Sequence, residues 1–218
     1  MARIVLIHGA WHGGWCWDAV ADRLRAMGHA VDAPDMPGGA ATLADCGAVV
    51  GEGPALLVGH SLGGMVIEAL AARATALVHL CSYLPRPGDS LAALDRMGGM
   101  PRNGPRNWPR DDQGRLLMPP EAAREMLYHD CPPPEVARAL ARLRPQPTGP
   151  MREPLPGPRI ALPRHYILCR NDRAIAPGLQ QAMLARAPVD QVHARDWGHS
   201  PFLSAPGELA RLLDRIAR

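Results

Sequence analysis

Residues 58–64 read VGHSLGG, and they continue the apolar run PALLV that begins at residue 54. Ser61 stands here in the pattern Gly-X-Ser-X-Gly, with Gly59 and Gly63 on either side. When a buried strand precedes such a motif and a helix follows it, the motif forms a sharp turn, the nucleophile elbow, that exposes a serine hydroxyl at the end of the strand. The helical pattern LGGMVIEALAARA completes this context. The stretch therefore predicts Ser61 as a candidate nucleophile at the carboxyl edge of an α/β sheet.

The same alternation of strand and helix patterns extends along the chain on both sides of this turn. The apolar runs lack alternating polar residues, which indicates strands buried on both faces of a parallel sheet. Short connections between the elements favour the α/β class. We predict a mostly parallel sheet of about six strands flanked by helices. The expected strands are 3–8, 30–35, 54–60, 76–82, 164–169 and 189–196, and the expected helices are 16–29, 42–50, 62–74, 177–187 and 204–218.

Residues 84–158 interrupt this alternation and are rich in Pro, Gly and Arg. Two patches within them, 120–130 and 133–145, carry apolar residues at helical spacing and begin at proline, which is accommodated in a first helical turn. We interpret the segment as a helical lid inserted after the fourth strand, with a disordered linker as the alternative. The core of a single-domain protein would then consist of residues 1–83 and 159–218.

Composition narrows the classes of partner. The chain has 218 residues and a net charge of +3, and its densest basic stretch, residues 101–115, is broken by prolines and aspartates. We expect a solvated loop there rather than a phosphate-binding patch, and no nucleic-acid partner. No apolar run reaches the roughly 18 residues of a membrane span. The N-terminus lacks a signal-peptide pattern, so we expect a cytoplasmic protein.

The cysteines and basic residues bear on two kinds of reaction chemistry, one that uses a bound metal and one that uses a lysine. The five cysteines are widely spaced without a CxxC pair, so no zinc or other metal site is expected. All 24 basic residues are arginine, and the absence of lysine excludes a mechanism through a lysine Schiff base.

A serine nucleophile needs a base, and His199 is the best placed of the nine histidines. It lies in the loop after the last predicted strand, which leaves the sheet at the same edge as Ser61. Asp172 follows the preceding strand at that edge and would fix the histidine tautomer. Asp89 and Asp196 are the alternative acids. Asp196 is three residues from the histidine in the same loop, which disfavours a position behind the imidazole.

The negative charge that develops on a substrate carbonyl requires backbone donors. The turn HGAWHGG after the first strand should place the Ala10 amide beside the Leu62 amide, so these two are the predicted oxyanion hole. Other residues near these turns or in the lid are tentative candidates for the substrate pocket: Gly9, Trp11, His129 and Trp197.

The chain resembles the α/β-hydrolase superfamily in four blocks: VLIHGAWHGGWCWD (5–18), GHSLGG (59–64), the loop around Asp172, and GHSPFLSAPGEL (198–209). The order nucleophile, acid, histidine is that of the superfamily. The blocks are most similar to the branch that contains plant methylesterases, hydroxynitrile lyases and bacterial carboxylesterases. This resemblance implies an α/β-hydrolase fold, an apolar acyl or alcohol pocket under the lid, and no cofactor.

Two positions bear on the reaction expected within this branch. Its lyases carry a threonine directly after the first strand's histidine and a lysine directly after the catalytic histidine, whereas Gly9 and Ser200 stand there in this chain. We therefore expect a serine hydrolase, a monomer or homodimer, that cleaves carboxylic esters of small to medium apolar substrates through an acyl-enzyme on Ser61. The alternatives are lactonase, thioesterase or lyase-like chemistry, and a ligand-sensing receptor with a retained triad.

Overall fold

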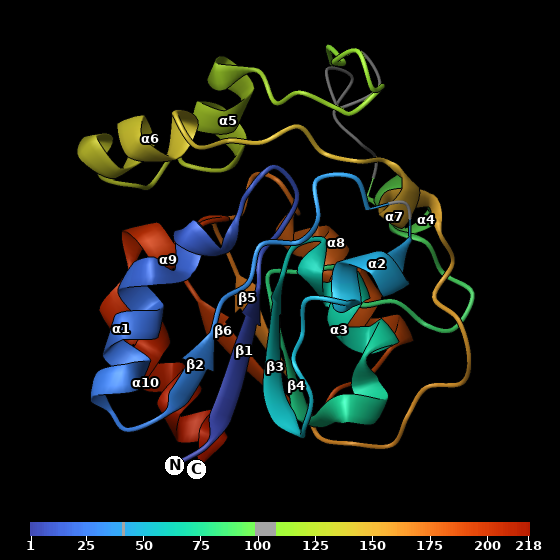
Figure 1. Ribbon diagram of the computed structural model, residues 1–218, viewed down its shortest axis with the longest axis vertical. Helices are drawn as coiled ribbons and strands as arrows, with labels where there is room; N and C mark the ends of the chain where they lie inside the picture. Colours follow the sequence, from blue (N-terminus) through green and yellow to red (C-terminus); the bar gives the residue numbers. More distant parts are fainter. Residues whose placement is uncertain (41, 99–107) are drawn as a thin grey trace.

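The computed structural model describes residues 1–40, 42–98 and 108–218, and its centre is a six-stranded sheet in which every neighbouring pair of strands is parallel (Figure 1). The strands lie in the order β2-β1-β3-β4-β5-β6, which confirms the predicted α/β architecture. The second strand is shorter than predicted and ends before Pro34, which has no N–H to donate to a neighbouring strand. The strands are β1 (Arg3–Ile7), β2 (Ala30–Asp32), β3 (Ala55–His60), β4 (Ala74–Leu80), β5 (Arg164–Cys169) and β6 (Gln191–Arg195).

Helices cover both faces of the sheet. Successive strand residues point to opposite faces, so Val5 and Ile7 pack in one apolar layer and Ile4 and Leu6 in the other. Both layers need apolar side chains, which explains the uninterrupted apolar runs. One face is covered by η1 (Gly14–Trp17), α1 (Asp18–Ala26), α9 (Pro201–Ser204) and α10 (Pro206–Ala217), and the other by α2 (Leu43–Gly47), α3 (Gly63–Ala69), η2 (Ala71–Arg73) and α8 (Pro177–Arg186) (Figure 1).

Residues 84–158 leave the sheet after β4 and return before β5. The predicted patches contain α5 (Pro120–Met126) and α6 (Pro133–Leu140), which lie above the carboxyl ends of the strands in Figure 1. Two further short helices, α4 (Leu91–Met97) and α7 (Gly149–Arg152), were not predicted. Within the predicted basic loop, residues 101–107 lie outside the described residues, and the Arg115 amide closes a turn on the Asp111 carboxylate (2.9 Å).

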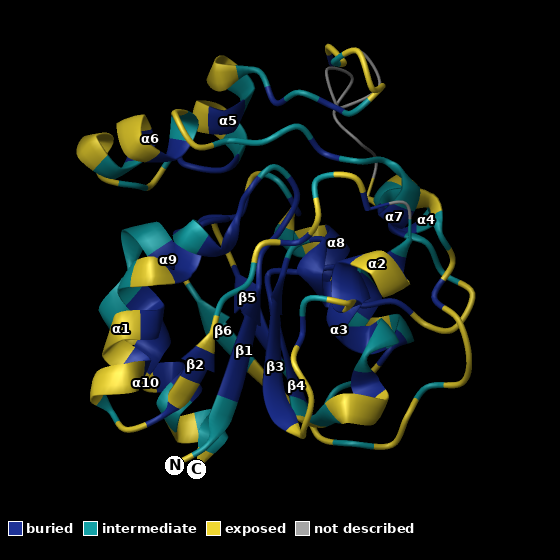
Figure 2. Cartoon of the chain, in the orientation of Figure 1, coloured by how far each residue is buried: buried dark blue, intermediate teal, exposed yellow. Residues whose placement is uncertain are grey.

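Burial follows the layers. Figure 2 shows the buried residues concentrated in the sheet and on the inner sides of its helices, whereas the outer sides of α1, α6 and α10 are exposed. Residues 108–158 belong to the segment for which we keep the name lid, as a label for its position only, and they have an apolar cluster of their own in which Leu127, Tyr128 and Val136 pack together. Across the described ranges, no helix combines the length and the apolar character that a membrane crossing requires.

Candidate active site

Ser61 lies between β3 and α3 with a left-handed backbone, at a φ of 53°. Residues other than glycine rarely adopt positive φ because Cβ crowds the backbone, so this turn is strained. Hydrogen bonds to the end of β4 hold it in place. The Ser61 amide donates to the Leu80 carbonyl (3.3 Å), and the Tyr83 amide donates to the Ser61 carbonyl (3.1 Å). The conformation is that of a nucleophile elbow.

The glycines of the motif allow α3 to approach the strands closely. A Cβ atom at Gly59 would lie 2.4 Å from the carbonyl oxygen of Gly63, and one at Gly64 would lie 2.1 Å from the carbonyl oxygen of Tyr83. Neither position can accept a side chain without a backbone shift. The spacing of glycine and serine in the sequence therefore reflects the packing of the strand-to-helix turn.

His199 and Asp172 form a buried pair at the carboxyl ends of β6 and β5. The imidazole Nδ1 donates to Oδ2 of Asp172 (2.8 Å), which leaves Nε2 unprotonated in the neutral ring. Oδ1 of Asp172 accepts from the amides of Ala174 (2.7 Å) and Ile175 (2.9 Å), which fix the carboxylate in position.

The two alternative acids lie elsewhere. The Asp196 carboxylate pairs with Arg170 at 3.0 Å on the surface, and the Asp89 carboxylate pairs with Arg186, also at 3.0 Å. The structure thus joins His199 to Asp172 and to neither alternative.

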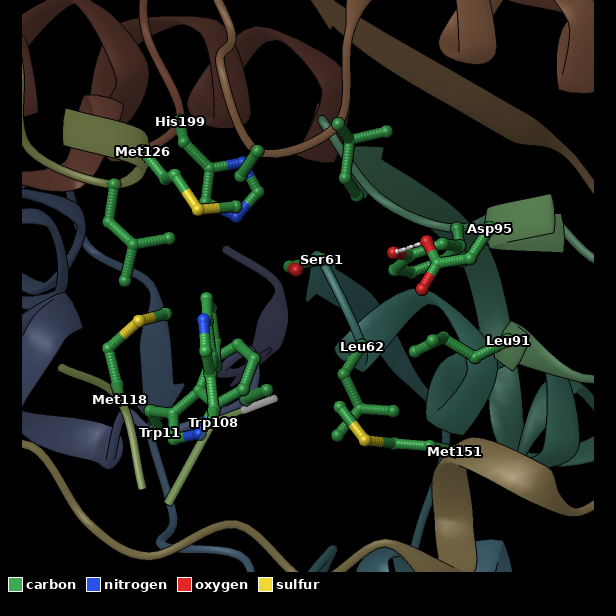
Figure 3. A pocket seen from close by; sticks show the side chains of 15 residues that line it. Trp11, Ser61, Leu62, Leu91, Asp95, Trp108, Met118, Met126, Met151 and His199 are labelled. Atoms are coloured by element: carbon green, nitrogen blue, oxygen red, sulfur yellow. Dashed lines mark hydrogen bonds between the residues drawn. The ribbon is translucent and has the colours of Figure 1, made fainter. Parts of the chain in front are cut away.

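Ser61 and His199 line one pocket between the sheet edge and the lid (Figure 3). About 620 Å³ of the pocket, its open mouth included, is not filled by protein atoms. Most of its wall is apolar, and much of that wall comes from the lid. The lining residues are Ala10, Trp11, Ser61, Leu62, Tyr83, Leu91, Asp95, Trp108, Met118, Met126, Leu127, Met151, Ala174, Ile175 and His199.

Ala10 and Leu62, the predicted oxyanion-hole residues, also belong to this wall. Within the described residues, neither backbone amide donates a hydrogen bond to another protein group. Both residues thus line the same pocket as Ser61, with amides that no described protein group engages.

Two buried histidines hold the loop that carries Ala10. His8 donates from Nδ1 to the Gly9 carbonyl (2.7 Å) and accepts at Nε2 from the Met36 amide (3.0 Å). His12 donates from Nδ1 to the Ala10 carbonyl (2.9 Å) and accepts from the hydroxyl of Tyr128 in the lid (2.9 Å). Burial lowers the pKa of His8 to about 4 and that of His12 to about 3, so both rings stay neutral near pH 7.

His60, the residue before the elbow serine, supports the other side of the site. Its Nε2 donates to the backbone carbonyl of His199 (2.8 Å), and the two rings lie with centroids 4.5 Å apart. Burial, reinforced by the proximity of His199, lowers the pKa of His60 well below its usual value. A neutral His60 thus fixes the His199 loop without adding charge beside the imidazole.

Of the tentative pocket residues, only Trp11 lines the pocket in the described structure. Gly9 lies behind the wall, where a Cβ would meet the His60 ring at 2.7 Å. Trp197 is buried in the core layer of α1 and α10, with Arg195 over its ring. His129 is half-buried at the end of the α5 region and is not among the lining residues.

In the described chain, His60, Cys81 and His199 are the one group of three side chains whose metal-ligating atoms lie within 4.8 Å of one another. Nε2 of His60 and Nδ1 of His199 already serve the hydrogen bonds described above. We assign no metal to this group.

The fold and these contacts are those of an α/β hydrolase, and comparisons with known proteins lead to the same class. The chain matches the alpha/beta hydrolase family over residues 4–212. It is 30% identical to the pyrethroid hydrolase of Sphingobium wenxiniae, with 98% of this chain and 87% of that protein covered. It is 27% identical to methylesterase 18 of Arabidopsis thaliana, with 99% and 97% covered. The solved structure of a pyrethroid hydrolase from Sphingobium faniae aligns with a TM-score of 0.82 at 29% identity, over 99% of this chain and 97% of that one.

The chain therefore belongs to the alpha/beta hydrolase family, in the branch of plant methylesterases and bacterial esterases. It is a hydrolase of the carboxylesterase type.

Proposed function

We propose that the chain cleaves carboxylic esters of small to medium apolar substrates through an acyl-enzyme on Ser61. The observation that carries the proposal is a convergence in one pocket. Its wall contains the strained Ser61, the His199 imidazole that Asp172 orients, and the residues Ala10 and Leu62, whose amides have no acceptor among the described residues. These are the nucleophile, the base with its orienting acid, and the oxyanion donors that acyl transfer requires.

The mechanism follows from these positions. Nε2 of His199 takes the proton of the Ser61 hydroxyl as the oxygen attacks the ester carbonyl, while Asp172 stabilises the imidazolium. The tetrahedral intermediate places its oxyanion on the Ala10 and Leu62 amides. It then collapses, and the alcohol leaves with the proton from His199. Water, activated by the same histidine, hydrolyses the acyl-enzyme and regenerates the serine.

The contacts of His8 support the role of the Ala10 amide. The described chain contains no cis peptide bonds, and in a trans peptide unit the N–H points opposite to the C=O. The Gly9 carbonyl and the Ala10 N–H belong to one such unit. Because His8 holds the Gly9 carbonyl on one side, the Ala10 N–H is directed to the other, and Ala10 lines the pocket.

The packing at Gly9 favours hydrolysis over lyase chemistry. A Cβ there would lie 2.7 Å from Nδ1 of His60 and 2.8 Å from Cβ of Ser61, so this backbone leaves no room for the threonine of the lyases. Two relatives are named for small-molecule esters, a methyl jasmonate esterase of Vitis vinifera and the pyrethroid hydrolase, which supports a small-molecule ester as the substrate of this chain.

The test combines covalent labelling with turnover. Wild type, Ser61→Ala and the control Ser204→Ala, which alters a serine of α9 outside the pocket wall, are treated with a fluorophosphonate and weighed intact by mass spectrometry. We expect one adduct on wild type and on Ser204→Ala, and none on Ser61→Ala. With 4-nitrophenyl butanoate, Ser61→Ala should lose about 10⁴- to 10⁶-fold in kcat. A folded wild type that neither forms the adduct nor hydrolyses the ester would refute the proposal.

A further inference from the structure

Asp95 is the one carboxylate that lines the pocket in the described structure, and its surroundings are otherwise largely apolar. Helix α4 places it there. The Ser90 hydroxyl accepts from the Ala93 amide (3.2 Å) and caps the helix, so that Leu91 and Asp95, four residues apart, share the face directed to the pocket. Asp95 is half-buried on this face.

The Asp95 carboxylate is held in place but only partly satisfied. The buried hydroxyl of Tyr83 donates to Oδ1, a bond visible as the dashed line in Figure 3. Burial raises the pKa of Asp95, and the bond from Tyr83 opposes this increase. Among the described residues, no arginine pairs with this carboxylate, and Oδ2 accepts no hydrogen bond. Oδ2 faces the open pocket and is not a buried unpaired atom, so water can hydrate it in the free protein, whereas a bound apolar group that covered it would leave it unpaired.

The arrangement around Ser61 indicates which part of an ester would meet this acceptor. In Figure 3, His199 and Asp95 lie on opposite sides of Ser61, and Leu91 lies beside Asp95. The leaving alcohol must lie next to His199, because it takes its proton from that imidazole. The acyl chain is therefore the part that extends toward Asp95.

We propose that Asp95 is a specificity residue that accepts a hydrogen bond from a hydroxyl on the acyl chain of the ester substrate. The inference rests on the proposed function, because it takes the acyl carbon to be bonded to Ser61. A purely alkyl acyl chain would cover Oδ2 and leave it unpaired, and sites built around a buried polar group discriminate strongly against ligands that lack its partner. Leu91 would contact the carbons of the chain before the hydroxyl.

The test compares three methyl esters of the same chain length: hexanoate, 6-hydroxyhexanoate and 6-methoxyhexanoate, with the 3-substituted pair as a second position. The methyl ether keeps the oxygen but cannot donate, so the ratio of kcat/KM for hydroxy over methoxy ester isolates the hydrogen bond. We expect wild type to favour the hydroxy ester by on the order of 10-fold or more at one of the two positions. Asp95→Leu should abolish that preference and still hydrolyse methyl hexanoate.

Controls separate this inference from the proposed function. Asp112→Leu, which alters an exposed lid carboxylate, should keep the wild-type ratio. If Asp95→Leu does not fold, Asp95→Asn provides the same comparison, with a reduced ratio expected. A pair with the hydroxyl on the alcohol, 6-hydroxyhexyl acetate and hexyl acetate, should show no preference that depends on Asp95.

The outcomes are distinct. A hydroxy-to-methoxy ratio near one at both positions, a ratio unchanged in the Asp95 variants, or an Asp95-dependent preference on the alcohol side would overturn the inference while ester hydrolysis stands. Failure to hydrolyse any of the esters, together with no fluorophosphonate adduct on wild type, would overturn the proposed function and this inference with it.

Discussion

Replacing Asp172 by asparagine tests the proposed catalytic pair with little change in volume. Oδ1 of Asp172 accepts from the amides of Ala174 and Ile175, whereas Oδ2 accepts from Nδ1 of His199. In Asp172→Asn, the two amides keep the side-chain oxygen in the Oδ1 position, so the NH₂ group must face His199. A donor opposite Nδ1 forces the ring into the tautomer protonated at Nε2, which cannot take the proton of Ser61.

The expected loss in kcat is about 10⁴-fold, the magnitude found when the same exchange imposes the wrong tautomer in a serine protease. The loss in stability should be small, about 1 kcal/mol, because the backbone amides keep their acceptor. Asp172→Ala is the contrasting variant. It leaves both amides without an acceptor and should cost about 1–3 kcal/mol for each group that stays buried and unpaired.

The assay measures kcat and KM with 4-nitrophenyl butanoate and the free energy of unfolding in urea for the three proteins. The assignment of Asp172 as the acid that orients His199 predicts that Asp172→Asn loses activity but keeps most of its stability, and that Asp172→Ala loses both. An Asp172→Asn variant that retains more than about a tenth of wild-type kcat would refute it, because the wrong tautomer leaves only the oxyanion hole and binding to accelerate the reaction.

Two further predictions concern the support of the site. Gly64→Ala should lower the free energy of unfolding in urea by about 1–3 kcal/mol, because the added Cβ would lie 2.1 Å from a backbone carbonyl oxygen. The control is Gly178→Ala, at an exposed helical site with open space around it, which should leave the stability unchanged or raise it slightly. Burial alone would raise the pKa of Glu68, but hydrogen bonds from Arg164 and His79 lower it from 4.5 to about 2. A lowered carboxyl pKa contributes up to about 3 kcal/mol of stability above about pH 4.5, and this stability is lost as the pH falls toward 2. Glu68→Gln should flatten this dependence of stability on pH. If the variant loses stability in acid as steeply as wild type, the lowered pKa of Glu68 is not its cause.

The fold could be predicted because its signals are local. Apolar runs such as RIVLI and ALLVG mark strands buried on both faces, and the glycines around Ser61 mark the turn between strand and helix. The positions of Asp172 and His199 followed from one further rule, that loops after parallel strands emerge at the same edge of a sheet. The hydrogen bond between these two residues is the contact that this rule anticipated.

The pocket wall could not be predicted in the same way, because it depends on how the lid packs. Trp197 precedes the histidine loop directly, yet its ring packs into the core beneath Arg195. Asp95 was not predicted as a pocket residue, although Ser90 followed by Leu91 and Leu94 is a sequence pattern that indicates a capped helix with one apolar side. Its direction toward Ser61 is set by tertiary contacts that no local pattern contains.

The position of the lid between β4 and β5 has a consequence for the order in which the chain folds. The connection from β4 to β5, residues 81–163, is about six times as long as the connection from β3 to β4, residues 61–73. Closing the longer loop costs about 1.6 kcal/mol more chain entropy. The pairing of β3 with β4, which holds the Ser61 turn, is therefore favoured to form before β5 and β6 bring Asp172 and His199. We therefore expect the Ser61 turn to form, during synthesis or refolding, before the proposed base and its acid arrive with the last strands.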